Sequence, residues 1–109
     1  MIPRRGEIWW VALDPTKGSE ISKTRPCVVF TRDLVNEHRR TVVVVPLSSS
    51  PSPHPPVKVA VHCDGKRAVA VVDQIRAIAK ERLRKRIGVL SEQEMEAISD
   101  ALRQILDFA

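Results

Sequence analysis

The sequence predicts a mainly β fold: a small curled barrel of short strands with one α-helix at its C-terminal end. Short runs of branched and aromatic residues alternate with polar segments rich in proline and glycine, a pattern typical of β domains. The Asp-Gly pair at positions 64 and 65 indicates a tight hairpin. Residues 91–109 instead repeat their apolar positions at helical spacing. A length of 109 residues, 43% of them hydrophobic, fits a single domain spanning residues 1–109.

Each strand is predicted from its own run of residues. The run TVVVVPL at 41–47 is apolar on both faces, which predicts a buried central strand. Trp9 and Trp10 are adjacent in the first strand and so point to opposite faces. We expect each in the core or in a dimer interface, with stacking on a nucleic-acid base as the alternative. The predicted extended segments are residues 7–13, 26–31, 41–47, 57–62, 68–72, 74–78 and 87–90.

The connections between these segments are mostly polar. Residues 14–24 contain a proline and a glycine and predict a long loop. Residues 48–56 hold four prolines, which cannot donate backbone hydrogen bonds to a sheet or helix, so they predict an exposed loop. Residues 33–40 predict one or two helical turns, and residues 80–86 form a basic segment.

The C-terminal helix is predicted to begin after Ser91. The Ser91 hydroxyl can cap the first turn, and Glu94, three residues later, completes a capping box. The apolar residues fall on one face of this helix and most acidic residues fall elsewhere. The apolar face consists of Met95, Ile98, Leu102 and Ile105.

Positive charge is concentrated before residue 91. Of the 18 Lys and Arg, 17 lie in residues 1–90 with 8 of the 13 Asp and Glu, so this part carries +9 and the remainder −4. Such a field attracts polyanions, nucleic acid above all, although a solvated surface explains it equally well. No apolar run approaches the roughly 20 residues of a membrane span, and no signal-peptide core is visible. We therefore expect a cytoplasmic protein with no membrane contact.

The usual catalytic and metal-binding patterns are not found in the sequence. The histidines lie at unrelated positions and are interpreted as surface residues. Cys27 and Cys63 form no metal-ligand pattern and would stay reduced in the cytosol. We therefore expect neither a metal nor a cofactor. The histidines are His38, His54 and His62.

What remains is a set of polar residues at strand ends, where binding groups gather. Arg25 closes the first long loop, and Ser48 opens the proline-rich one. Glu20 lies within the first loop, and Gln74 follows an apolar strand. Each also has an ordinary explanation, respectively a surface base, a turn residue, a solvated acid and a polar strand end.

Six blocks of sequence carry a resemblance to a known family. They are RGEIWW at 5–10, LDP at 13–15 with GSE at 18–20, RPCVV at 25–29, PLSS at 46–49, DQIR at 73–76, and RL at 82–83 with IGVLS at 87–91. In this order, and over nearly the whole chain, they resemble the MazF/PemK family of toxin endoribonucleases from type II toxin–antitoxin systems. Ser48 stands where that family usually has Thr, so the hydroxyl is kept. The proline-rich loop after it is unusual for the family and leaves the preferred RNA sequence undefined.

The resemblance implies a fold, an activity and partners. The fold would be the SH3-like barrel with a terminal helix of the MazF, PemK and CcdB toxins, assembled as a homodimer. The activity would be metal-independent, sequence-specific cleavage of single-stranded RNA. Attack by a ribose 2′-OH would give a 2′,3′-cyclic phosphate and a 5′-OH. The partner would be a MazE-like antitoxin whose acidic, disordered tail covers the RNA groove.

The resemblance also implies roles for individual residues. A guanidinium is effectively never deprotonated in a protein, so we expect the family's catalytic arginine to stabilise phosphate charge rather than to move protons. Proton transfer stays open between Arg25 and Glu20, and Glu20 can instead bind a base edge. The catalytic residues are Arg25 and Ser48, and the substrate-binding residues are Ser19, Glu20 and Gln74.

Two alternatives remain at this point. A CcdB-like toxin would bind DNA gyrase and cleave no RNA, but gyrase contacts in that family involve a Trp-bearing C-terminal tail, and this chain ends LDFA. A non-catalytic SH3-like module that binds RNA or protein would share the barrel. Incubation with long RNA in EDTA separates both alternatives from the nuclease.

Overall fold

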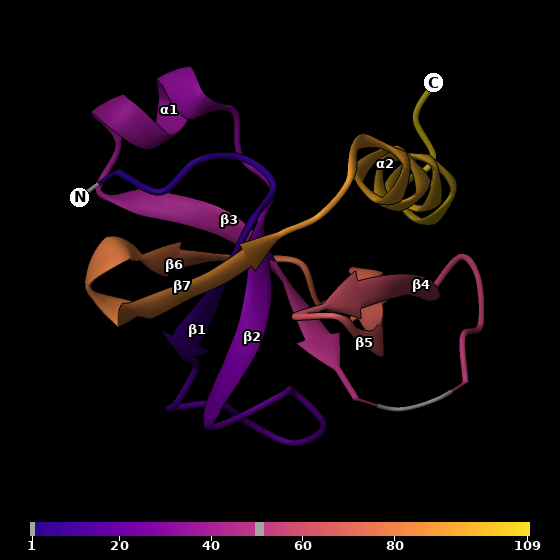
Figure 1. Cartoon of the computed structure of the whole chain (residues 1–109), viewed down its shortest axis with the longest axis horizontal. Helices are drawn as coiled ribbons and strands as arrows, with labels where there is room; N and C mark the ends of the chain where they lie inside the picture. The colour runs from indigo at the N-terminus through magenta and orange to yellow at the C-terminus, as the bar shows by residue number, and fades with distance from the viewer. Residues whose placement is uncertain (1, 50–51) are drawn as a thin grey trace.

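The strands form one strongly curled antiparallel sheet, seen in the computed structural model in Figure 1. The structure describes residues 2–49 and 52–109. In this part of the chain the strand order is β4-β5-β3-β2-β1-β7, and β6 pairs with β3. The mainly β class with a C-terminal helix is therefore confirmed. The strands are β1 Glu7–Ala12, β2 Thr24–Val29, β3 Thr41–Ser48, β4 Lys58–Cys63, β5 Lys66–Val71, β6 Arg76–Ala79 and β7 Leu83–Val89; the helices are α1 Asp33–His38 and α2 Glu92–Leu106, with 3₁₀ turns η1 Val72–Gln74 and η2 Lys80–Arg82.

Strand β3 joins the parts of the sheet because it pairs with three neighbours. Its first half pairs with β6 and its middle with β2. Its last two residues, Leu47 and Ser48, pair with β5. The predicted burial of this strand is confirmed, since Val42, Val44, Val45 and Leu47 are each at most 1% exposed.

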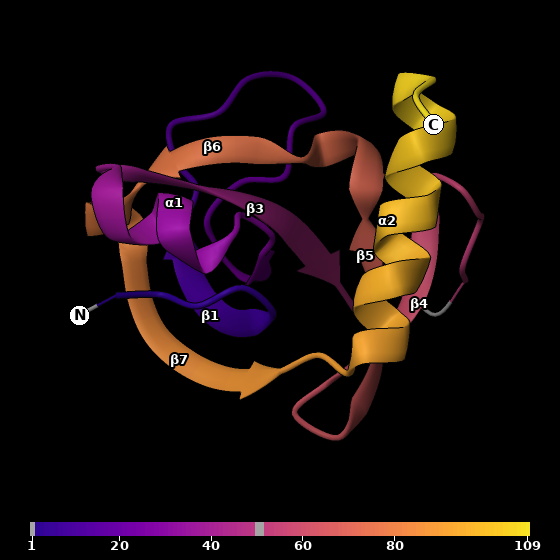
Figure 2. The same ribbon diagram turned by 90° about the horizontal axis from the view of Figure 1, so that it is seen from above.

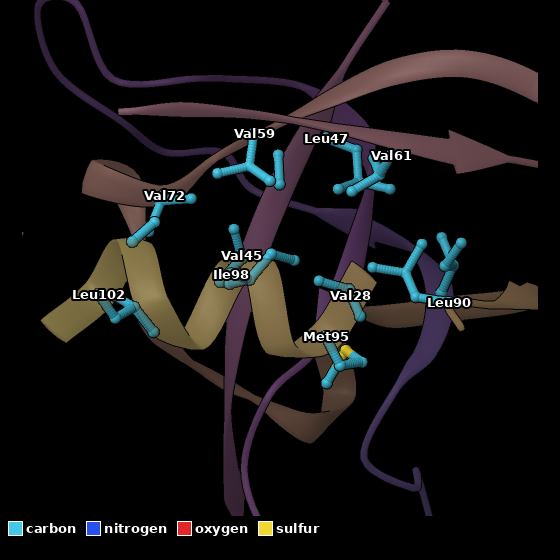
Figure 3. Close-up of a cluster of buried hydrophobic side chains, with 13 residues drawn as sticks. Val28, Val45, Leu47, Val59, Val61, Val72, Leu90, Met95, Ile98 and Leu102 are labelled. Carbon is cyan, nitrogen blue, oxygen red and sulfur yellow. The ribbon is translucent and has the colours of Figure 1, made fainter. Parts of the chain in front are cut away.

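Alternate side chains of β3 enter two separate hydrophobic cores. Val45 and Leu47 pack with Ile98 of α2 in a core between the helix and the sheet (Figure 3). Val42 and Val44 pack inside the barrel, in a second core that contains Trp9. Figure 2 shows α2 lying along the β4–β5 hairpin, beside the barrel. The two cores divide the molecule into a barrel and a helix-covered hairpin that share β3.

Helix α2 begins as the sequence predicts. The Ser91 hydroxyl accepts a hydrogen bond from the backbone N–H of Glu94 (3.1 Å), and the Glu94 carboxylate accepts one from the N–H of Ser91 (2.9 Å). The apolar face is also confirmed, because three of its four residues are buried in the first core and the fourth is half-buried against it. None of the helices in residues 2–49 and 52–109 is long and apolar enough to cross a membrane.

One predicted extended segment is interrupted, and another begins earlier than predicted. The extended segment at 74–78 is interrupted, because residues 72–74 form η1 and β6 begins only at Arg76. The basic segment at 80–86 is η2 followed by the first half of β7. Strand β7 therefore begins before the extended segment predicted at 87–90. The sequence concealed its first half because its pairing with β1 contains two register shifts, which break the alternation of polar and apolar residues.

The proline-rich loop and the start of α2 together cover the outer edge of β4. The loop is exposed at residues 52–55, as predicted, while Ser50 and Pro51 lie outside the described residues. His54 and Lys58 exchange backbone hydrogen bonds of 3.0 and 2.9 Å at one end of β4. At the other end, the Glu94 carboxylate accepts a 2.7 Å hydrogen bond from the backbone N–H of His62. These bonds occupy backbone groups that would otherwise be open to pairing with another strand.

The position of Glu94 predicts a loss of stability in acid. Partial burial by itself would raise the pKa of Glu94, but hydrogen bonds from Ser91 and His62 lower the pKa below its ordinary value of 4.5. Because the folded-state pKa lies below the unfolded one, the stabilisation is present above pH 4.5 and is lost as the pH falls through the folded-state pKa. Glu94→Gln should therefore flatten the acid side of the curve of unfolding free energy against pH, measured by urea titration. Glu92→Gln, on the same helical turn, is the matched control, and an equal flattening there would contradict the assignment.

Candidate functional site

The loop between β1 and β2 is closed at its base and ordered at its tip. At the base, the N–H of Leu13 donates to the Lys23 carbonyl (2.8 Å), and the N–H of Lys23 donates to the Asp14 carboxylate (2.9 Å). At the tip, the Glu20 carboxylate accepts from the N–H of Lys17 (2.5 Å), and the Lys17 carbonyl accepts from the N–H of Glu20 (3.2 Å). These bonds give a long polar loop one shape.

Two arginines from later in the sequence donate hydrogen bonds to the backbone at the start of this loop. Arg82 of η2 donates to the Ala12 carbonyl (3.0 Å) and to the Asp14 carbonyl. Arg76 of β6 donates to the Leu13 carbonyl at 3.5 Å. Carbonyls at the end of β1 and at the start of the loop therefore receive charged donors, which make stronger hydrogen bonds than neutral ones.

Gln74 of η1 fixes the tip of the loop. Its side-chain oxygen accepts from the backbone N–H of Ile21 (2.7 Å), and its amide nitrogen donates to the Ser19 carbonyl (3.4 Å). Gln74 was predicted to bind substrate, and in the structure it is also a positioning group for the loop. It lines one groove of about 310 Å³ together with Ser19 and Glu20. The three predicted substrate-binding residues therefore lie together.

Arg25 and Ser48 face a second groove of about 250 Å³. Strands β2 and β3 are antiparallel, and Cys27 pairs with Pro46. Two residues further along this register, Arg25 at the start of β2 lies beside Ser48 at the end of β3. The Arg25 side chain is exposed, and its Nε donates to the Ser22 carbonyl at 3.3 Å. Its two terminal nitrogens have no hydrogen-bond partner in the described part of the chain. The guanidinium is thus held at one atom and presents its other donors to the groove.

The two grooves adjoin, because Glu20 and Ile21 line both. All five residues predicted from the sequence are therefore brought to one surface of the loop and strand ends. Sequence reasoning did not select Ile21, Ser22, Asp73 or Arg76 as site residues. The DQIR block was the available signal for the last two, since it already contained Gln74.

The remaining chemistry-bearing residues contribute no nucleophile to these grooves. Burial raises the pKa of the Cys27 thiol to about 12, which the nearby Arg76 charge only partly offsets, so Cys27 stays protonated at neutral pH. The three histidines are exposed, as predicted. Across residues 2–49 and 52–109, no group of three His, Cys, Asp or Glu side chains lies close enough to hold a metal ion. Trp9 is buried in the barrel core, whereas Trp10 is 38% exposed.

Comparisons with known proteins place this arrangement in a class. A family model described as the PemK-like, MazF-like toxin of type II toxin–antitoxin systems matches residues 4–106. Endoribonuclease MazF9 of Mycobacterium tuberculosis is 39% identical over 116 residues, which cover 95% of this chain and 96% of the relative. The barrel is thus that of a small toxin of this class. The chain belongs to the PemK-like, MazF-like toxin family.

Solved structures share the same fold at low sequence identity. The crystal structure of MazF from Deinococcus radiodurans superposes with a TM-score of 0.88 at 19% identity, covering 99% of both chains. An endoribonuclease from a mycobacterial species, solved in complex with its cognate antitoxin, gives a TM-score of 0.77 at 23% identity and covers 99% of this chain and 96% of that one. The expected fold of the MazF toxins is therefore confirmed.

Proposed function

We propose that this toxin-family chain cleaves single-stranded RNA at specific sequences without a metal, by attack of a ribose 2′-OH on the adjacent phosphodiester. The observation that carries the proposal is the groove that Arg25 and Ser48 both line. The 39% identity to a curated endoribonuclease over nearly the whole chain favours this activity over gyrase binding and over a non-catalytic module.

The reaction requires stabilisation of negative charge more than it requires a protein nucleophile. The 2′-oxygen forms a bond to phosphorus, the bond from phosphorus to the 5′-oxygen breaks, and the products are a 2′,3′-cyclic phosphate and a 5′-OH. In the transition state, charge gathers on the two non-bridging oxygens. The planar fork of Arg25 suits two parallel hydrogen bonds to those oxygens, and the Ser48 hydroxyl adds a third donor. A preorganised donor of this kind contributes about 2.7–4 kcal/mol.

Proton transfer is assigned to Glu20 in this proposal. The 2′-OH must lose a proton as it attacks, which a guanidinium cannot take, and the departing 5′-oxygen gains a proton from solvent water. Among the described residues that line the Arg25–Ser48 groove, Glu20 is the one that carries a carboxylate. Its hydrogen bond from the N–H of Lys17, at 2.5 Å, holds one carboxylate oxygen in place, and the other oxygen has no hydrogen-bond partner among the described residues.

The proposal includes a homodimer and an antitoxin. The mycobacterial neighbour was solved with its cognate antitoxin, and further Deinococcus radiodurans structures are of MazE with MazF. For this chain we propose a MazE-like partner whose acidic, disordered tail covers the grooves, since residues 1–90 carry +9. Apolar side chains that lie 60% or more exposed, Leu34 and Val89, support burial against a second copy. Action on cellular RNA would place the protein in the cytoplasm.

Arg25 variants in EDTA test the activity and the role of the guanidinium together. The wild type should cut long RNA in EDTA and leave 5′-OH ends, because no step uses a metal. Arg25→Ala should be nearly inactive, and Arg25→Lys should fail as well, since a point charge cannot reproduce two parallel donors. Arg32→Ala, which removes an exposed arginine away from the grooves, is the matched control. Activity that disappears in EDTA and returns with magnesium, or a fully active lysine variant, would refute the mechanism.

Ser48 variants separate transition-state stabilisation from binding. Ser48→Ala should lower the single-turnover cleavage rate by roughly 100- to 1,000-fold, because a donor used in the transition state affects turnover more than ground-state affinity. Binding of a non-cleavable 2′-deoxy analogue should change little. Ser48→Thr keeps the hydroxyl and should retain most activity. A folded alanine variant that cleaves within a few-fold of wild type would remove Ser48 from the catalytic residues.

The proposed dimer is open to a direct measurement. A chain of this length buries a limited fraction of its surface alone, so pairing adds stability. Light scattering at micromolar concentration should report twice the 12.2 kDa mass of one chain. A Val89→Asp variant should shift the mass toward one chain if this exposed residue lies in the interface. A wild-type mass of one chain across this range would contradict the dimer.

A further inference from the structure

The groove lined by Gln74 adjoins the site of cleavage, and apart from Glu20 its residues have no part in the proposed chemistry. It measures about 310 Å³ and is lined mainly by the tip of the first loop and by residues of η1 and β6. It shares Glu20 and Ile21 with the Arg25–Ser48 groove, so RNA bound at the second groove would place a neighbouring nucleotide here. Bases of single-stranded RNA are unstacked and can be read along their Watson–Crick edges.

The orientation of the Gln74 amide in this groove is set by its partners. The backbone N–H of Ile21 can only donate, so the atom 2.7 Å from it is the side-chain oxygen. The amide nitrogen therefore lies on the other side, where its contact with the Ser19 carbonyl is long, at 3.4 Å. Gln74 thus keeps a donor for a ligand, and its acceptor is already occupied.

Asp73, the preceding residue of η1, supplies the opposite chemistry. Its side chain is exposed, and it lines the same groove as Gln74. No hydrogen bond or ion pair to its carboxylate is found in the part of the chain that the structure describes, although Arg76 lines the same groove. A carboxylate that keeps both oxygens open offers two adjacent acceptors. Together, the two residues offer one donor and two acceptors to a base in this groove.

We propose that Asp73 and Gln74 read a guanine close to the cleaved phosphate. The Watson–Crick edge of guanine carries one acceptor, O6, followed by two donors, N1–H and N2–H, so the Asp73–Gln74 pair complements it as cytosine does. Adenine and cytosine each offer the carboxylate a single amino donor, one hydrogen bond fewer than guanine. Uracil places its one N–H between two carbonyls and would bring a carbonyl oxygen against the charged carboxylate, which is unfavourable. This inference rests on the proposed cleavage of RNA and adds a base preference to it.

The proposed contact is tested by changing one chemical group on the RNA base and one on the protein. The cuts that the wild type makes in a long RNA of mixed sequence should share a guanine at one fixed position. Replacing that guanine with inosine, which lacks the N2 amino group, should slow cleavage roughly tenfold. Asp73→Asn turns one acceptor into a donor and should cleave both RNAs at similar rates. Asp64→Asn removes the same charge from the hairpin turn, at a positive φ that Asn adopts readily, and should keep the full difference.

Binding measurements keep this inference separate from the proposed cleavage. They use two short RNAs that contain the cut site, one with the guanine and one with inosine in its place. Anisotropy titrations with 2′-deoxy versions at the cut position need no catalysis. A guanine-over-inosine preference in the wild type that Asp73→Asn abolishes supports the inference even if no RNA is cut. Equal binding and equal cleavage of the two RNAs by the wild type would overturn it. So would a preference that persists in Asp73→Asn, because the carboxylate would then not be the reader.

Discussion

Strand β3 pairs with three other strands and is buried on both faces, and the placement of the functional side chains follows from this constraint. Its four consecutive valines leave no position for a polar group until the strand ends at Ser48. The partner β2 is equally apolar from Cys27 onward, so its charged residue, Arg25, also falls at the strand end. Burial of the strand interiors therefore concentrates the polar groups at one end of the barrel, where the two grooves lie.

The first loop gains its order from groups outside itself. Two arginines and Gln74, all from the segment between β5 and β7, satisfy backbone groups that the loop cannot pair internally. Each such bond contributes only about 0.5–1.5 kcal/mol, and the bonds to charged donors contribute more. Together they set the position of Glu20 before substrate arrives. A donor or base that is already in place requires no reorganisation during the reaction, which is the main advantage of a rigid site.

Much of this arrangement was predictable from the sequence, and the features that were not predicted have physical causes. The buried β3, the hairpin at Asp64 and the capped helix follow from local patterns that tertiary structure did not override. Only the end of strand β7 was predicted, at 87–90, and its first half was missed because its bulged pairing hides the two-residue period. The site residues were selected through a family resemblance and brought together by the structure, but Asp73 was not selected. The DQIR block contained Asp73, but an exposed aspartate shows no role of its own in the sequence, and its place beside Gln74 in a groove distinguishes it.

The capping carboxylate of α2 links local unfolding of the helix to exposure of the sheet edge. Glu94 closes the first turn of the helix and also occupies the backbone N–H of His62 on the edge strand β4. If the start of the helix frays, the same event uncovers the apolar core beneath it and frees the edge of the hairpin. An unpaired edge next to exposed hydrophobic side chains is the usual seed of aggregation. Local opening of one helical turn would thus remove active toxin from solution by self-association, before the barrel that carries the grooves has unfolded.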